Sequence, residues 1–379
     1  MRSSKLYYAD SYLKNFKAQV LSSVPSGEDY FIELVETAFY PEGGGQPSDT
    51  GVIGTCNIKY VFEKDGRVVH IGDKELTPGQ EYNAKLDWQK RYEHMQLHTA
   101  EHLVSGIVNK LYNADNVGFG IGETYVTIDY NVELSREDTN KIELLANEAV
   151  FLNIPVAIEY FEKAPQINYR SKKELSGELR LVTIEDYDIC ACAGTQLRQT
   201  GEIGLIKIIS TQKYKSGSRL YMLCGYRALR DYSEKEANIT AISTLLSSKP
   251  YESAEYVKRL FDERDALKFE LIAAKHMLVD MKCAALEPGE KAVIFEENIT
   301  ADDMKRYVEN LKENFGLVAV FSGNEEQGYR YMISSKSPDF QPLVKNMNAT
   351  LSGKGGGKEV AGGHVSAKEA QIRDFLAGV

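Results

Sequence analysis

His98-Thr99-Ala100-Glu101-His102 places two histidines four residues apart within the segment from Trp88 to Tyr112, whose apolar periodicity predicts a helix. Residues i and i+4 lie on one face of a helix, separated by a rise of about 6 Å, so both imidazoles can reach one metal ion. Zinc takes nitrogen and sulfur ligands in a tetrahedral arrangement, and catalytic zinc sites keep one position open. The histidine pair therefore predicts half of a zinc site.

The remaining ligands are predicted far downstream, in the segment Cys192-Ala193-Gly194-Thr195-Gln196. Cys190 and Cys192 are two residues apart and face the same side of an extended segment, so either thiol could bind the metal. The turn expected at Gly194-Thr195 favours Cys192. The open coordination position that would remain indicates a catalytic site.

Composition restricts the classes of protein that this chain can belong to. Its 379 residues allow two to four compact units, and 43% hydrophobic and 26% charged residues are typical of globular proteins. No apolar run is long enough to span a membrane, the N-terminus lacks the features of a secretory signal, and five scattered cysteines suit a reducing compartment. We therefore expect a cytoplasmic protein with no membrane partner. A net charge of −10 argues against broad nucleic-acid binding but allows a local contact with one folded RNA.

The order of patterns along the chain predicts an α+β protein with four parts. Short alternating runs between Gly, Asp and Pro turns predict an N-terminal β-barrel over residues 1–90. An α+β block follows over 91–228, with the histidine helix, a strand from Val117 to Tyr130, a helix at 135–152 and strands at 154–161 and 179–184. A long helical arm is expected over 229–286, broken at Ser247-Ser248-Lys249-Pro250, and a C-terminal α/β domain over 287–379.

The second helix of the arm carries a coiled-coil-like stripe. Its positions alternate steps of three and four residues, with one charged residue among them: Val257, Leu260, Arg264, Leu267, Leu271, Ala274, Leu278 and Met281. This spacing fits a helical hairpin within one chain and pairing between two chains equally well. A homodimer through the arm or the C-terminal domain is therefore one of two expectations.

A glycine-rich segment from Phe39 to Gly51 contains Gly43, Gly44 and Gly45 directly before Gln46. Without a Cβ, such a loop allows backbone to approach a ligand closely, although a flexible barrel turn is equally compatible with it.

These motifs together resemble a known family. FYPEGGGQPSDTG, HMQLHTAEH, TIDY and CAGTQLRQTGEIG are similar, in that order, to the editing domain of alanyl-tRNA synthetases and to the free-standing alanyl-tRNA editing proteins of AlaX type. The resemblance covers residues 1–228. The terminal GKGGGKEVAGGHV resembles the Gly-rich end of the DHH-associated domain of long-form editing proteins, so that the likeness spans almost the whole chain.

The resemblance implies a trans-editing hydrolase that removes a wrong amino acid, chiefly serine and also glycine, from tRNA(Ala). A pocket for alanine cannot strongly exclude such small competitors by binding alone, so a second, hydrolytic site is needed. The chain begins at the editing-like barrel, and we therefore expect editing in trans without aminoacylation. The family pattern implies one zinc ion, with ligands at His98, His102 and Cys192 and a fourth position at Gln196.

Two positions depart from that pattern. Gln196 stands where the family carries a histidine, so it either binds zinc weakly or leaves the fourth position to water. Gly118-Phe119-Gly120 lacks the polar side chain that similar proteins place in the amino-acid pocket. Gln46 and Thr195 are then the predicted catalytic side chains.

Substrate contacts are expected at two places. We expect Gly43, Gly44 and Gly45, together with Gly118 and Phe119, to line the site that binds the aminoacyl ester. Near the flexible C-terminal glycines, the lysines Lys345, Lys354 and Lys358 are the predicted contacts with the body of tRNA(Ala), although an ordinary surface loop fits the same residues.

Two other functions fit part of the sequence. His98 to His102 also matches the His-x-x-Glu-His pattern of zinc peptidases, with Glu101 as general base, but that function leaves Cys192 and the glycine loop unexplained. A tRNA-binding adaptor dimer with a decayed metal site is the stronger alternative, because of Gln196 and Gly120.

Overall fold

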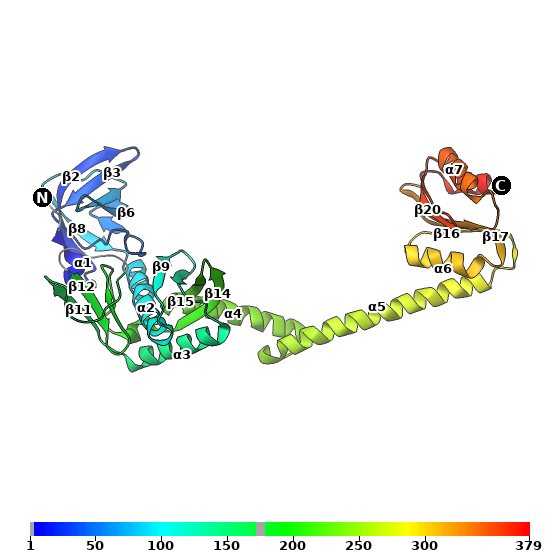
Figure 1. The fold of residues 1–379 in the computed structure, drawn as a ribbon. Helices are drawn as coiled ribbons and strands as arrows, with labels where there is room; N and C mark the ends of the chain where they lie inside the picture. The colour runs from blue at the N-terminus through cyan, green and yellow to red at the C-terminus, as the bar shows by residue number, and fades with distance from the viewer. Residues whose placement is uncertain (1–3, 172–178) are drawn as a thin grey trace. The chain divides into compact units, whose positions relative to one another are not determined.

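The computed structural model describes residues 4–171 and 179–379 and divides the chain into two units, Met1–Thr240 and Ala241–Val379 (Figure 1). Both contain helices and sheets, so the predicted α+β class is confirmed. Within the described residues, no helix has the length and apolar character needed to cross a lipid bilayer.

The first unit begins with a two-stranded parallel pair, β1 (Ser4–Lys5) with β4 (Glu36–Thr37), and the short helix α1 (Leu6–Ala9). Six strands then close into a barrel in the order β2-β3-β7-β6-β5-β8. Their bounds are β2 Asn15–Ser26, β3 Asp29–Leu34, β5 Gly51–Ile53, β6 Cys56–Lys64, β7 Arg67–Gly72 and β8 Glu81–Leu86. Alternate residues such as Ile32 and Leu34 point inward and are fully buried, as the period of two along a strand requires.

The histidine-bearing helix α2 (Trp88–Tyr112) has the bounds that the sequence predicts. Asp87 caps its N-terminus through the Lys90 N–H, and Asn113 ends it in a left-handed conformation. Residues all around the middle of α2 are buried, which identifies it as a core helix rather than a surface one. The predicted helix at 135–152 is confirmed as α3 (Arg136–Leu152).

Two sheets flank these helices. The first has the order β14-β15-β10-β9, from β9 (Asn116–Ile121), β10 (Val126–Tyr130), β14 (Ile206–Tyr214) and β15 (Gly217–Cys224). The segment expected as one strand from Val117 to Tyr130 is therefore a hairpin of β9 and β10. The second sheet has the order β11-β12-β13, from β11 (Val156–Phe161), β12 (Leu179–Ile184) and β13 (Asp188–Ala191), and the 3-10 helix η1 (Thr200–Ile203) follows.

Helix α4 (Gly225–Leu246), the 3-10 turn η2 (Pro250–Glu252) and helix α5 (Ser253–Ala284) form the predicted helical segment, with the expected break before Pro250. Along α5, stripe residues such as Leu260, Leu267 and Leu278 are more than half exposed. The pairing of this stripe, within or between chains, stays a prediction.

The second unit contains a five-stranded sheet of order β16-β17-β18-β20-β19, with helices after β16, β18 and β20. The strands are β16 Gly289–Glu296, β17 Phe315–Asn324, β18 Gly328–Ser335, β19 Lys354–Gly356 and β20 Val360–Val365, and the helices are α6 Ala301–Leu311, α7 Phe340–Thr350 and α8 Glu369–Ala377. Strand β16 runs parallel to β17, whereas the other pairs are antiparallel. Lys354 thus lies in a short edge strand rather than in an open loop.

One buried ion pair joins α2 to the glycine-rich segment. The fully buried Arg91 donates from Nε to both Asp49 carboxylate oxygens at 3.0 Å and also donates to the Ser11 and Ala38 carbonyls. The guanidinium is therefore fully paired. Removing one partner leaves an uncompensated buried charge, which is costly.

We expect Asp49→Asn to lower the free energy of unfolding by about 3–5 kcal/mol, because it strands the Arg91 charge. Denaturant titration followed by the fluorescence of Trp88, the chain's single tryptophan, measures this change. The matched control is Glu81→Gln in the exposed Lys17–Glu81 pair, which should change stability by less than about 1 kcal/mol. Equal, small effects of the two substitutions would contradict the assignment of Arg91 as a structural anchor.

Candidate metal and active site

His98 and His102 lie on consecutive turns of α2 with their rings stacked. The ring centroids are 5.4 Å apart, the ring planes are inclined by 30°, and both side chains are buried. The arrangement follows from the i, i+4 spacing, since side chains four residues apart lie above one another on a helix.

Cys192 reaches this pair from the segment that follows β13. Its Sγ lies 3.4 Å from His98 Nε2, and one ligand atom each of His98, His102 and Cys192 falls within 4.8 Å of the others. Gly194 makes this approach possible, because a Cβ at that position would lie 2.0 Å from His98 Cε1. The structure therefore brings together the two predicted histidines and the predicted cysteine.

A second layer of side chains fixes both imidazoles. His98 Nδ1 donates to Gln46 Oε1 at 2.9 Å, and His102 Nδ1 donates to Asp188 Oδ2 at 3.0 Å. Each bond leaves Nε2 as the nitrogen that can bind a metal, as outer partners commonly do at metal sites. Gln46 is thus an orienting group for His98.

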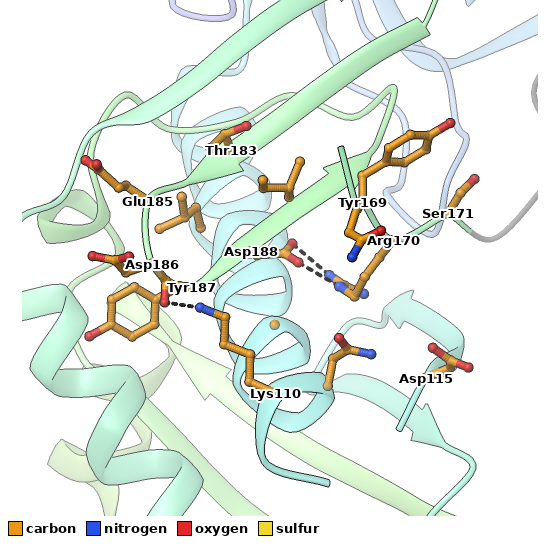
Figure 2. Close-up of a pocket in the computed structure, with 15 residues that line it drawn as sticks. Lys110, Asp115, Tyr169, Arg170, Ser171, Thr183, Glu185, Asp186, Tyr187 and Asp188 are labelled. Carbon is orange, nitrogen blue, oxygen red and sulfur yellow. Dashed lines mark hydrogen bonds and ion pairs between the residues drawn. The ribbon is translucent and has the colours of Figure 1, made fainter. Parts of the chain in front are cut away.

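Arg170 holds the Asp188 carboxylate in turn. Its Nε and Nη2 donate to the two carboxylate oxygens at 2.7 and 2.8 Å (Figure 2). Both groups border a cavity of about 790 Å³, which also contacts Lys110 and Tyr187. Such a two-pronged pair restricts the carboxylate to one orientation, and through it the His102 ring.

The electrostatics of the trio favour a thiolate. Burial alone would raise the pKa of Cys192, but the charges of His98 and His102 and their hydrogen bonds bring it well below its ordinary value. Burial would likewise lower the pKa of His102, but Cys192 and the hydrogen bond to Asp188 raise it well above its ordinary value. The thiolate is the form of cysteine that binds metals.

Gln196 lies beside the sulfur but is engaged elsewhere. Its Oε1 accepts from the Thr99 hydroxyl at 2.8 Å, and its Nε2 lies 3.7 Å from Cys192 Sγ. The Leu197 N–H donates to the same Thr99 hydroxyl oxygen at 3.0 Å, so the hydroxyl proton is directed to Gln196. The amide nitrogen of Gln196, rather than its oxygen, therefore faces the Cys192 sulfur and the two histidines.

The glycine loop closes over one side of the trio. Gly43 and Gln46 exchange backbone hydrogen bonds of 3.0 Å, which occupies the Gly43 N–H. The N–H groups of Gly44 and Gly45 have no acceptor among the residues that the structure describes. A side chain at Gly45 would collide with Phe119, whose ring lies 5.1 Å from that of His98.

The other predicted catalytic, substrate-binding and tRNA-binding residues lie in three places. Thr195 belongs to the centre, since its Oγ1 accepts from Gln46 Nε2 at 2.8 Å. Gly118 instead packs against the Asp129 side chain. In the second unit, Lys345, Lys354 and Lys358 are exposed and, within the described part of the chain, form no ion pair.

Glu101, the general base of the peptidase hypothesis, is not part of the ligand trio. It accepts hydrogen bonds from Ser105 at 2.8 Å and from Asn116, and it is buried. The Glu101 carboxylate is therefore engaged in hydrogen bonds within the core, with partners on α2 and β9.

Known proteins resemble this chain over most of its length. Three family models match: tRNA synthetases class II (A) at residues 4–90, the threonyl and alanyl tRNA synthetase second additional domain at 179–221, and the DHHA1 domain at 289–379. The alanyl-tRNA editing protein AlaX-L of Pyrococcus horikoshii is 30% identical over 98% of this chain and 96% of its own length. The chain belongs to the family of alanyl-tRNA editing proteins.

Alanine–tRNA ligases are similar over part of their length. Those of Pyrococcus abyssi and Ignicoccus hospitalis are 31% and 29% identical over 96% and 98% of the chain, which spans 42% of each ligase. This editing-family chain therefore aligns with less than half of each ligase.

Sequence reasoning missed the outer partners of this editing-family site. Asp188, Arg170 and Thr99 support the trio but were not predicted. A signal existed for Asp188, because residues 188, 190 and 192 alternate along β13 and its extension and so face one side. The positions of Arg170 and Thr99 in the sequence follow no such alternation with the predicted ligands, so no pattern indicated their role.

Proposed function

We propose that this chain hydrolyses the ester that joins serine, and secondarily glycine, to the 3′ end of tRNA(Ala), acting in trans at a zinc-containing site. The observation that carries the proposal is the convergence of two oriented imidazoles and one thiolate within 4.8 Å. Water adds its hydroxyl to the acyl carbon, the acyl C–O bond breaks, and the tRNA hydroxyl leaves with a proton. Membership of the editing family supports the same reaction.

The donor set supports zinc as the metal. Two imidazole nitrogens and a thiolate are ligands that zinc prefers, and outer partners on both imidazoles are typical of zinc sites. His98, His102 and Cys192 would hold the ion. When bound there, zinc supplies a Lewis acid that polarises an ester carbonyl or lowers the pKa of a water molecule.

We infer that Gln196 leaves the fourth position open. Its oxygen is bound to Thr99, and its amide N–H group faces the Cys192 sulfur. A thiolate accepts hydrogen bonds and would repel the amide oxygen, so the thiolate favours the observed amide orientation. Three protein ligands with an open position are the arrangement of catalytic zinc sites.

The glycine loop offers the means to bind the ester. The exposed N–H groups of Gly44 and Gly45 are directed by left-handed backbone with φ of 60° and 83°, and they can donate to an ester or ribose oxygen. Gln46 couples this loop to the site, since its amide binds His98 on one side and Thr195 on the other. Phe119, whose ring lies 5.1 Å from that of His98, would bound the space for the amino acid.

The second unit is proposed to contact the body of tRNA(Ala). Lys345 lies on α7, Lys354 on the neighbouring strand β19 and Lys358 beyond the end of that strand, and all three are exposed. Exposed lysines bind phosphates and release counterions, which makes their affinity depend on salt. The homodimer and the coiled-coil pairing of α5 stay proposals that rest on the sequence pattern.

We expect the protein to hydrolyse Ser-tRNA(Ala) faster than Gly-tRNA(Ala), and both much faster than Ala-tRNA(Ala). Chelation should abolish the activity and added zinc should restore it. Cys192→Ala should lower the rate by more than the about 10- to 100-fold typical of losing an outer partner. A deacylation assay with labelled aminoacyl-tRNA measures these rates.

Cys56→Ala is the matched control, because Cys56 is buried in the barrel and takes no part in the trio. A zinc-free protein that binds tRNA tightly without hydrolysis would favour the adaptor instead. Peptide cleavage that survives Cys192→Ala would favour the peptidase.

Gln196→His tests the open position. We expect the added imidazole to tighten zinc binding about tenfold, equivalent to about 1.4 kcal/mol, as measured by chelator competition. In the cobalt-substituted protein, azide should shift the visible spectrum of the wild type but not that of Gln196→His. If Gln196→Ala weakened zinc binding as strongly as Cys192→Ala does, the glutamine would be a ligand after all.

Replacing Lys354 and Lys358 together by glutamine should weaken tRNA(Ala) binding and reduce the slope of log affinity against log salt by about 2. Filter binding across a salt series measures the slope. Lys305→Gln on α6 is the charge-matched control in the same unit. An unchanged slope in the double variant would remove these lysines from the RNA contact.

A further inference from the structure

A small cavity of about 220 Å³ opens beside Cys192, on the same segment that carries the metal-binding sulfur. Its walls come from four elements of the first unit: Tyr8 on α1, Tyr160 on β11, Leu179 and Arg180 on β12, and Ala191 on β13. The Tyr160 hydroxyl donates to the Tyr8 carbonyl at 3.1 Å and ties two of the walls together. The cavity is smaller than the about 300–1,000 Å³ usual for drug-sized ligands, so it suits a single nucleotide unit.

Arg180 is the charged group of this cavity. It is only 8% exposed, its Nη1 donates to the Cys192 carbonyl at 2.6 Å, and its Nε donates to the Tyr160 hydroxyl at 3.3 Å. The guanidinium also lies 5.6 Å from the centre of the Tyr8 ring. All of these partners are uncharged.

The other arginines with largely buried side chains in this unit are paired with carboxylates. Arg91 pairs with Asp49, Arg170 with Asp188 and Arg227 with Glu93. Among the residues that the structure describes, no carboxylate pairs with Arg180 in this way. Burying a guanidinium without a counter-ion is unfavourable, so its position indicates an anion that arrives with a ligand.

The thiolate of Cys192 does not fill that role. Arg180 bonds the carbonyl oxygen of Cys192, whereas the sulfur has the Gly194 N–H at 3.3 Å and His98 Nε2 at 3.4 Å. Arg180 therefore lines the cavity with no anionic partner among the residues that the structure describes.

We propose that this cavity binds the 3′-terminal nucleotide of the acylated RNA, with Arg180 on its 5′-phosphate and the Tyr8 and Tyr160 rings against its sugar and base. The inference rests on the proposed function. The ester bond sits on the ribose of that nucleotide, so its phosphate and base must lie within one nucleotide of the reacting carbon. Arginine binds phosphate through two parallel N–H groups, and aromatic rings stack on bases without regard to sequence.

The test compares adenosine 5′-monophosphate with adenosine, which is the terminal nucleotide of tRNA with and without its phosphate. In equilibrium binding to the full-length, zinc-loaded protein, the monophosphate should bind about tenfold or more tightly than adenosine, because hydrogen bonds to charged groups are strong. In Arg180→Gln that preference should disappear. Arg180→Lys keeps the charge and should retain part of it.

Deacylation kinetics give the second measurement. Arg180→Gln should raise KM for Ser-tRNA(Ala) about tenfold or more while kcat and zinc content change little, since the residue binds substrate and not the metal. Arg198→Gln is the matched control, because Arg198 also lies over a tyrosine ring, that of Tyr12, but its side chain is 65% exposed.

An unchanged preference for the monophosphate in Arg180→Gln would overturn the subsite. Equal loss of the preference in Arg180→Gln and Arg180→Lys, accompanied by lower thermal stability in both, would assign Arg180 a structural role and also overturn it. Failure of the wild type to deacylate any tRNA would refute the proposed function, whereas the binding comparison would still decide the nucleotide site.

Discussion

The approach of the Cys192 segment to α2 depends on the absence of a side chain at residue 194. A Cβ there would lie 2.0 Å from Cε1 of the buried His98 ring, so a side chain at residue 194 would displace either that ring or the Cys192 segment. With glycine, the sulfur comes within 3.4 Å of His98 Nε2. The ligand trio, the lowered pKa of the thiol and the nucleotide cavity beside Cys192 all follow from that close approach.

Helix α2 is the element on which the separate parts of the site converge. Gln46 from the glycine loop fixes His98, whereas Asp188 from β13 fixes His102. Arg91, near the start of the same helix, anchors the glycine-rich segment through Asp49. Because each partner comes from a different element, the orientation of the imidazoles is determined by the packing of the glycine loop and β13 against α2. A candidate metal site assembled in this way is rigid only when the first unit is folded as a whole.

Local patterns in the sequence sufficed for the helices α2 and α3, but they missed the hairpin of β9 and β10 and gave no long-range contacts. The bounds of α2 and the stacking of His98 with His102 come directly from helical periodicity, and the break before Pro250 comes from the chemistry of proline. The partners of the imidazoles depend on strand pairing across more than fifty residues, which no local pattern encodes. Gln196 illustrates the difference, because its substitution for histidine was visible in the sequence, yet the direction of its amide depends on Thr99, ninety-seven residues away.

The charge balance of the chain explains why recognition of an RNA end has to be local. With a net charge of −10, the protein as a whole repels a polyanion, so counterion release cannot drive broad binding. Most of the buried cations near the site are already neutralised by carboxylates, which hold the fold and the imidazoles. Arg180 lies beside Cys192 without a carboxylate partner among the described residues, so its guanidinium can bind one phosphate group. The exposed lysines of the second unit can add affinity for the body of the RNA, but only a 3′ end can bring its phosphate to this guanidinium.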